Sequence, residues 1–333
     1  MKKKFVTFLL LSLFILSLGG CAQPEKEVKQ PPKTPQPVNF NVAVLRGPSA
    51  VSMVKMIDQT PSLGEGVKVN YIMEQSPDVL ASKLLTGEVE IATIPTNLAA
   101  KIYNKGVGYQ LAAMNTWGVM YVVTNGVTVS NWSDLKGQPI NAVAKGSAAD
   151  VVLKYLLSKN NINPDTDVAL SYIASPVEAA QLMIAGKSKI AALPEPWVSM
   201  VLSKNPNARL ALDLQKEWTR LNGENVPFGQ TCLVVKKDFA NKNPQIVTKF
   251  LTEYKNSINW ANKNAAQTGE LAKKHDIGIP ADITAAAIPR CNIRYADAVS
   301  ARPAVEKYLQ VLLDFSPESI GGKLPDAEFY YQK

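Results

Sequence analysis

The feature that most constrains the fold of this chain is an internal duplication. Residues 42–97 align without a gap with residues 141–196, at an offset of 99, and 13 of the 56 paired positions are identical. The identical positions include a glycine, a Ser-Pro dipeptide and a proline in each copy, namely Gly47 and Gly146, Ser76-Pro77 and Ser175-Pro176, and Pro95 and Pro194. Similarity at a fixed spacing is typical of a repeated structural unit, so we expect two units of the same build.

Each copy predicts the order strand, helix, strand, helix, strand. Short apolar runs end at a glycine or proline, and the segments between them carry apolar residues at helical spacing. A serine followed by proline predicts the start of the second helix, and a glycine predicts its end. Strands that alternate with helices are typical of parallel βαβ units. The sequence therefore predicts an α/β fold with two similar lobes.

Two further strand-like runs, residues 120–124 and 231–235, flank the second copy. If these runs pair with each other, the chain crosses between the lobes twice. The predicted organisation is then a discontinuous first lobe, residues 38–125 plus 236–333, and a second lobe at residues 126–235 that includes the hinge strands.

The N-terminal sequence is typical of an export signal. Three lysines precede an apolar run at residues 5–18, which is shorter than the roughly 20 residues that a membrane-spanning helix needs. The sequence Leu18-Gly19-Gly20-Cys21 resembles a bacterial lipobox, which implies cleavage before Cys21 and lipid attachment to its thiol. The alternative is an uncleaved anchor. We predict a signal peptide at residues 1–20 and a proline-rich, flexible, lipid-anchored linker at residues 21–37.

Composition excludes several kinds of chemistry. The net charge of +8 includes the three leader lysines, and the chain has no basic stripe with interleaved aromatics, so nucleic-acid binding is not expected. One histidine and three cysteines leave little for zinc, haem or multi-histidine catalysis. The segment Gly47 to Val51 departs from the G-x-S-x-G pattern of hydrolases. We predict no catalytic residue, metal or cofactor, and Cys232 and Cys291 either form a disulfide or remain free.

The loops at the ends of the expected strands are the candidate binding site, because ligands of open α/β sheets bind beyond the carboxyl ends of the strands. These loops are rich in hydroxyl and amide residues that open helices, which suits a small polar or anionic group. The candidates in and after the first copy are Gly47, Pro48, Ser49, Ser76, Thr96, Asn97, Asn115, Thr116 and Trp117. Those in the second copy are Gly146, Ser147, Ala148, Glu195 and Trp197.

Many of these candidates also have a structural alternative. The serines can cap helices, the glycines can serve turns and the tryptophans can pack in the core. Thr96, Asn97, Asn115 and Thr116 have weaker structural roles, which favours ligand contact. Glu195 lies between two prolines at a strand end, and a carboxylate facing the cleft there favours a ligand with an N–H donor or a positive charge.

These features resemble the substrate-binding lipoproteins of ABC importers, in the group of nitrate, sulfonate and taurine receptors and thiamine-pyrimidine-precursor binders. The resemblance extends from Val38 to the C-terminus. It is carried by Gly47-Pro48-Ser49, by Glu88 to Ala92 leading to Pro95-Thr96-Asn97, by Asp134-Leu135-Lys136-Gly137, and by Phe239 to Phe250.

The resemblance implies a type II periplasmic-binding-protein-like fold, with two α/β lobes joined by a two-strand hinge. It also implies a monomeric receptor, held by its lipid at the outer side of the cytoplasmic membrane, that closes on a small polar organic solute. The expected partners are the permease and ATPase subunits of the importer. An exported enzyme of the same fold and a ligand sensor without transport are the alternatives.

One departure from the family bears on the ligand. The cleft loops carry few basic residues beyond Arg46 and Lys145, which disfavours a nitrate-like oxyanion. Glu195 points instead to an amine or an amino-substituted heterocycle. Arg290 and Asn292, on either side of Cys291, are additional candidates for reaching the cleft.

Overall fold

The computed structural model describes residues 37–332. The predicted signal peptide at residues 1–20, the predicted lipidation site Cys21 and all but the last residue of the predicted 21–37 linker lie outside the described residues. Between residues 37 and 332, no helix combines the length and the apolar character that crossing a membrane requires.

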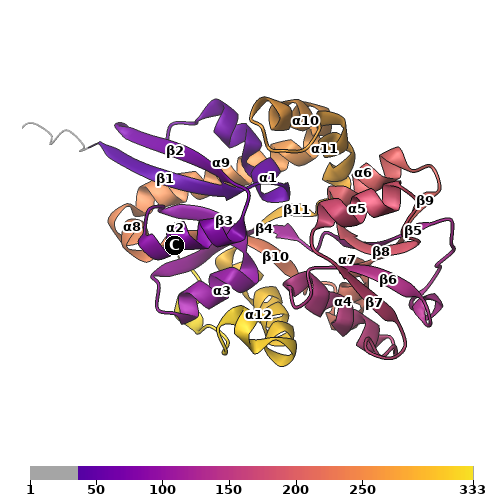
Figure 1. Ribbon diagram of the computed structural model, residues 1–333. Helices are drawn as coiled ribbons and strands as arrows, with labels where there is room; N and C mark the ends of the chain where they lie inside the picture. The colour runs from indigo at the N-terminus through magenta and orange to yellow at the C-terminus, as the bar shows by residue number, and fades with distance from the viewer. Residues whose placement is uncertain (1–36, 333) are drawn as a thin grey trace, which may run out of the picture. The chain divides into compact units, whose positions relative to one another are not determined.

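The first copy of the duplication forms one half of a six-stranded sheet (Figure 1). Its elements are β1 (Val38–Leu45), α1 (Pro48–Gln59), β2 (Val67–Glu74), α2 (Pro77–Thr86), β3 (Ile91–Pro95) and α3 (Thr96–Asn104). β1 pairs in parallel with β2 and with β3. The sheet is completed by β4 (Tyr109–Trp117), β10 (Gly229–Lys236) and β11 (Ile293–Asp297), in the order β11-β4-β10-β3-β1-β2.

The second copy repeats this arrangement in a five-stranded sheet. Its elements are β6 (Pro139–Val143), α4 (Ala148–Lys159), β7 (Ala169–Ile173), α5 (Pro176–Ile184), β8 (Ile190–Pro194) and α6 (Trp197–Lys204). With β5 (Met120–Asn125) and β9 (Ala208–Asp213), the strand order is β7-β6-β8-β5-β9. The order β2-β1-β3-β10 thus matches β7-β6-β8-β5, and the predicted α/β fold with two similar units is confirmed.

The two crossing runs lie in different sheets and do not pair with each other. β5 pairs with β8 and β9 in the second sheet, whereas β10 pairs with β3 and β4 in the first. By sheet membership, lobe one comprises residues 38–117 and 229–332, and lobe two comprises residues 120–222. Both runs are apolar and largely buried, so either can occupy the interior of a sheet, and the sequence does not specify which neighbour each one takes.

Helices follow the local signals in the sequence. Ser76 caps α2 by accepting a hydrogen bond from the Asp78 N–H, and Ser175 caps α5 in the same way for Glu178. A proline occupies the first position of each helix, where its missing N–H costs nothing. Ser76 therefore caps a helix, which was the structural alternative to ligand binding for this residue.

The remaining helices lie around the two sheets. Lobe two also contains η1 (Trp132–Leu135) and α7 (Leu214–Asn222). Lobe one contains α8 (Lys237–Lys242), α9 (Pro244–Lys263), α10 (Ala265–Lys274), α11 (Ala281–Ala287), η2 (Ile288–Arg290), α12 (Ala298–Phe315), η3 (Pro317–Ile320) and η4 (Ala327–Phe329). α12 packs against α4 of lobe two, and α11 packs against α6 of lobe two.

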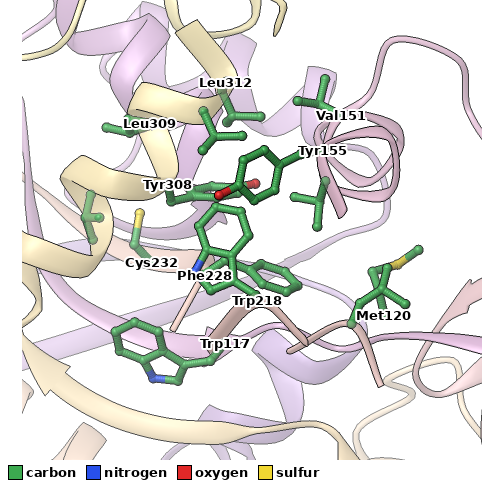
Figure 2. Packing of buried hydrophobic residues seen from close by; sticks show 14 of the residues in the cluster. Trp117, Met120, Val151, Tyr155, Trp218, Phe228, Cys232, Tyr308, Leu309 and Leu312 are labelled. Carbon is green, nitrogen blue, oxygen red and sulfur yellow. The ribbon is translucent and has the colours of Figure 1, made fainter. Parts of the chain in front are cut away.

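An aromatic cluster, defined as Tyr155, Trp218, Phe228 and Tyr308, lies where α12 meets lobe two (Figure 2). Trp218 is 5.1 Å from Tyr155, 5.4 Å from Phe228 and 6.2 Å from Tyr308 between ring centroids. All four side chains are buried. Edge-on and tilted ring contacts at these distances add to the stabilisation from apolar burial, so this cluster joins the two lobes.

The contact between α10 and α11 gives a first prediction. A Cβ added at Gly269 would lie 2.2 Å from the backbone oxygen of Ala281, and backbone atoms cannot yield as a flexible side chain can. We expect Gly269→Ala to lower the free energy of unfolding by about 1–3 kcal/mol, measured by urea denaturation. Gly108→Ala is the matched control, because nothing lies within 4 Å of its Cβ position. Equal losses in both variants would contradict the packing described for α10.

Candidate ligand-binding site

A cavity of about 630 Å³ lies between the lobes, at the carboxyl ends of β1, β3, β6 and β8. Residues of the first turns of α1, α3 and α4 line it, including Ser49, Asn97 and Ala148. A volume of this size suits a small organic ligand. The edge that the sequence predicted for ligand binding is therefore the edge at which the structure places a cavity.

The structure brings some of the predicted residues to this cavity and leaves others elsewhere. Those that line it are Pro48, Ser49, Asn97, Thr116, Gly146, Ser147, Ala148 and Glu195. Those that do not line it are Gly47, Ser76, Thr96, Asn115, Trp117 and Trp197.

The residues outside the cavity have structural contacts instead. The indole N–H of Trp117 donates to the carbonyl of Arg294 at 3.0 Å, and Trp197 packs against the core of lobe two. Thr96 is buried, with its hydroxyl 4.0 Å from the sulfur of Met114. Their positions near strand ends suggested the site, but the direction of each side chain depends on its tertiary neighbours.

Asn115 belongs to a closed ring of hydrogen bonds behind the cavity wall. The Ser49 hydroxyl donates to Thr231 Oγ1 at 3.2 Å, and the Thr231 hydroxyl donates to Asn115 Oδ1 at 2.6 Å. Asn115 Nδ2 donates to the hydroxyl oxygen of Tyr254 at 2.6 Å. The same Tyr254 oxygen lies 2.7 Å from Ser52 Oγ. The Ser52 hydroxyl donates to the Ser49 carbonyl at 2.6 Å, which closes the ring. Tyr254 must then donate to Ser52, so every hydroxyl hydrogen in the ring is committed.

This ring decides what Ser49 and Thr231 offer to a ligand. Both residues line the cavity, yet their hydrogens are engaged behind its wall, so each presents its oxygen only as an acceptor. Burial raises the pKa of Tyr254 well above its usual value, which keeps this link of the ring a neutral hydroxyl at ordinary pH.

Two other side chains offer donors. Thr116 is 1% exposed and lines the cavity, and its hydroxyl has no hydrogen-bond partner among the described residues. Gln230 also lines the cavity, and its Oε1 accepts from the Val119 N–H at 3.2 Å. That bond fixes the orientation of the amide and leaves the Gln230 amide hydrogens for a ligand. The N-terminal turn of α4, which lines the cavity at Ala148, adds backbone N–H groups.

The rest of the wall is largely apolar, and most of its residues were not predicted from the sequence. These residues are Leu45, Leu98, Val119, Met120, Val143, Val152, Phe228 and Tyr308. Phe228 and Tyr308 come from segments far from the duplicated copies, so no local signal connects them to the strand ends. The position of Val119 and Met120 at the first crossing between the lobes was a usable signal.

Glu195 lines the cavity, but its charge is already paired. Its Oε1 accepts from Arg290 Nε at 2.5 Å and from the Ser199 hydroxyl at 2.9 Å, and its Oε2 accepts from the Ser199 N–H at 3.0 Å. The Glu195 side chain is fully buried. Because a guanidinium neutralises this carboxylate, Glu195 is not available as a counter-ion for a cation, and the sequence-based argument for an amine ligand loses its basis. Arg290, an additional candidate from the sequence, reaches Glu195.

Two cationic side chains line the cavity, Arg46 and Lys101. Arg46 is paired with Asp276, with Nη2 3.2 Å from Oδ2. Among the described residues, no group of three or more His, Cys, Asp or Glu side chains that could hold a metal ion is present.

The disulfide considered for Cys232 and Cys291 does not form. Both thiols are free and buried, and they pack in different core clusters. Burial raises the pKa of Cys232 to about 12, so this thiol stays protonated and unreactive at ordinary pH.

The unpartnered hydroxyl of Thr116 gives a second prediction. Thr116→Val removes no protein hydrogen bond, so we expect the free energy of unfolding to stay unchanged or rise slightly, and the affinity for a bound solute to fall about tenfold. Thr231→Val, which breaks two hydrogen bonds of the ring, is expected to lower stability by about 1–3 kcal/mol. Denaturation and titration calorimetry on both variants check this contrast. A comparable stability loss for Thr116→Val would show that its hydroxyl has a protein partner.

Two similar α/β lobes around a ligand-sized cavity define a periplasmic-binding-protein-like molecule. The sequence model of the NMT1-like family matches residues 33–274. The chain belongs to this family, and the resemblance to nitrate- and sulfonate-type binding proteins is confirmed.

Solved structures share the fold across most of the chain. An ABC transporter protein from Parabacteroides distasonis has a TM-score of 0.75 and 28% identity, covering 88% of this chain and 99% of that one. The periplasmic aliphatic sulphonate binding protein SsuA from Escherichia coli has a TM-score of 0.71 and 14% identity, covering 90% and 93%.

A curated relative also matches in sequence. YtlA, a candidate binding protein of Bacillus subtilis (strain 168), is 24% identical over 209 residues, covering 61% of this chain and 60% of the relative. The match therefore spans less than two thirds of the relative's length.

Proposed function

We propose that this protein binds a small organic solute between its two lobes and delivers it to the permease of an ABC importer. The observation that carries the proposal is the cavity itself, which residues of both lobes line. One of these residues is Thr116, whose buried hydroxyl has no hydrogen-bond partner among residues 37–332. An unpaired buried hydroxyl is costly, and a bound solute would satisfy it. The relatives, an ABC transporter protein and a sulphonate binding protein, support the same reading.

The chemistry of the wall favours a solute with an apolar body and an acceptor-rich head. Thr116, Gln230 and the first turn of α4 offer donors, and Lys101 offers a positive charge. The aliphatic and aromatic side chains of the wall suit a hydrocarbon portion. A carboxylate, sulfonate or carbonyl compound fits these donors, whereas Glu195, the carboxylate that suggested an amine, is already neutralised by Arg290.

The proposed mechanism is closure of the lobes. A solute that contacts both lobes only when they are close together shifts the equilibrium toward the closed state. The permease would then recognise the closed surfaces. The lipid on Cys21 and the linker at residues 21–37 would hold this receptor outside the cytoplasmic membrane.

A thermal-shift screen over alkyl sulfonates, carboxylates, amines, pyrimidines and nitrate tests the function. A solute at about 100 times its dissociation constant stabilises the folded state by about 2.7 kcal/mol, which corresponds to roughly 5–10 °C for a chain of this size. We expect saturable stabilisation by acceptor-rich compounds that are recovered unchanged. Absence of any stabilising compound, or chemical turnover of one, would count against a receptor, and turnover would support an exported enzyme.

A further inference from the structure

Within residues 37–332, two pairs of helices contact each other across the boundary between the lobes, and the chemistry of the two contacts differs. On one side, α12 meets α4 through the aromatic cluster, and on the other, α11 and η2 meet α6 through Arg290. Figure 1 shows these contacts at opposite edges of the boundary between the two sheets. Tyr308 and Glu195 both line the cavity, so the cavity lies between an apolar contact and a polar one.

The backbone of Arg290 belongs to lobe one. Its neighbours Ile288 and Cys291 are buried in a lobe-one core cluster with Phe40 and Val42. Arg290 Nη2 also donates to the carbonyl of Ala286 at 3.1 Å, within the same segment. The guanidinium is therefore held from lobe one.

All the other partners of Arg290 belong to lobe two. Nε donates to Glu195 Oε1 at 2.5 Å, Nη2 donates to the Ser199 hydroxyl at 2.6 Å, and the Arg290 carbonyl accepts from the Tyr121 hydroxyl at 2.8 Å. Glu195 and Ser199 are each 2% exposed, whereas the Arg290 side chain is 30% exposed. One residue thus makes three polar contacts across the boundary, at the rim of the cavity.

The two contacts respond differently when lobes separate. Opening the aromatic cluster parts Tyr308 of lobe one from Trp218 of lobe two and exposes buried aromatic surface to water, which is unfavourable. Forming the Arg290 contact removes water from a guanidinium and a carboxylate, and this desolvation cost offsets much of their attraction, so rehydration on opening recovers much of what is lost. The polar side is therefore the side that can open reversibly, and the aromatic side is the pivot.

We propose that Arg290 is an interlobe latch that forms with Glu195 and Ser199 on closure and breaks on opening, while the lobes pivot about the aromatic cluster. The proposal rests on the proposed solute-binding function and adds the residue that regulates it. Loss of the latch depopulates the closed state, and the apparent dissociation constant of the solute rises in proportion.

The test measures the distance between the lobes without any solute. Val79→Cys on α2 and Val177→Cys on α5 provide spin-label sites, because these residues are 47% and 40% exposed and lie in the first turns of helices whose first residues, Pro77 and Pro176, line the cavity. The native Cys232 and Cys291 are buried and remain unlabelled, and Cys21→Ser in every variant removes the third cysteine of the chain. In pulsed electron paramagnetic resonance, Arg290→Met is expected to shift the distance distribution to longer values.

Arg220→Met is the matched control, because Arg220 pairs with Glu217 inside a single helix of lobe two, at 2.5 Å. It is expected to leave the distances unchanged. Glu195→Gln, which keeps the shape of the side chain, is a second route to the same shift if Arg290→Met folds poorly. Unchanged distances in both latch variants overturn the proposal, and because no solute is present, that result leaves the solute screen intact.

Discussion

Replacing Trp218 by alanine is expected to lower the free energy of unfolding by about 3–5 kcal/mol, one of the two largest effects predicted for this protein. Trp218 is fully buried at the centre of the aromatic cluster, and its indole N–H donates to the Val226 carbonyl at 2.7 Å. The truncation removes ring contacts in both lobes at once and leaves a cavity that the surrounding rings cannot fill. Guanidinium denaturation followed by circular dichroism measures the change.

Phe315→Ala is the matched control for this substitution. Phe315 contacts Tyr155 at 6.3 Å between ring centroids, at the edge of the same cluster, but it is 47% exposed. We expect its loss to cost less than about 1 kcal/mol, because little apolar surface leaves a buried environment. Similar costs for the two variants would mean that Trp218 is not the centre of the contact between the lobes.

Replacing Ala148 by tryptophan is expected to weaken solute binding about 100-fold or more, equivalent to about 2.7 kcal/mol. Ala148 is the first residue of α4, is half-buried and lines the cavity. An indole at this position occupies the space that the solute needs, yet it displaces no packed core residue. Stability should therefore stay within about 1 kcal/mol of the original protein. Calorimetric titration with the compound identified in the thermal-shift screen measures the affinity.

Ala185→Trp controls for the addition of an exposed indole to lobe two. Ala185 is exposed, caps the C-terminus of α5 and does not line the cavity. Its affinity for the solute is expected to equal that of the original protein. If Ala148→Trp also binds normally, the solute occupies a different place from the cavity between the lobes.

The sequence by itself determined the repeated unit. The duplicated pattern predicted strand, helix, strand, helix, strand in each copy, and the Ser-Pro pairs marked where α2 and α5 begin. These signals are local, because a cap or a turn is set by residues within a few positions of each other. The edge of the sheets at which a cavity forms followed from the parallel order of the strands.

Only the tertiary structure decided how the copies are joined and what the cavity offers. β5 joins the second sheet and β10 joins the first, Arg290 neutralises Glu195 across 95 positions, and Thr231 engages Asn115 across 116 positions. The sequence does not reveal whether a carboxylate is free to bind a cation or is already paired with one. Its charge and the direction of each hydroxyl depend on partners far along the chain, and long-range packing brings those partners into contact.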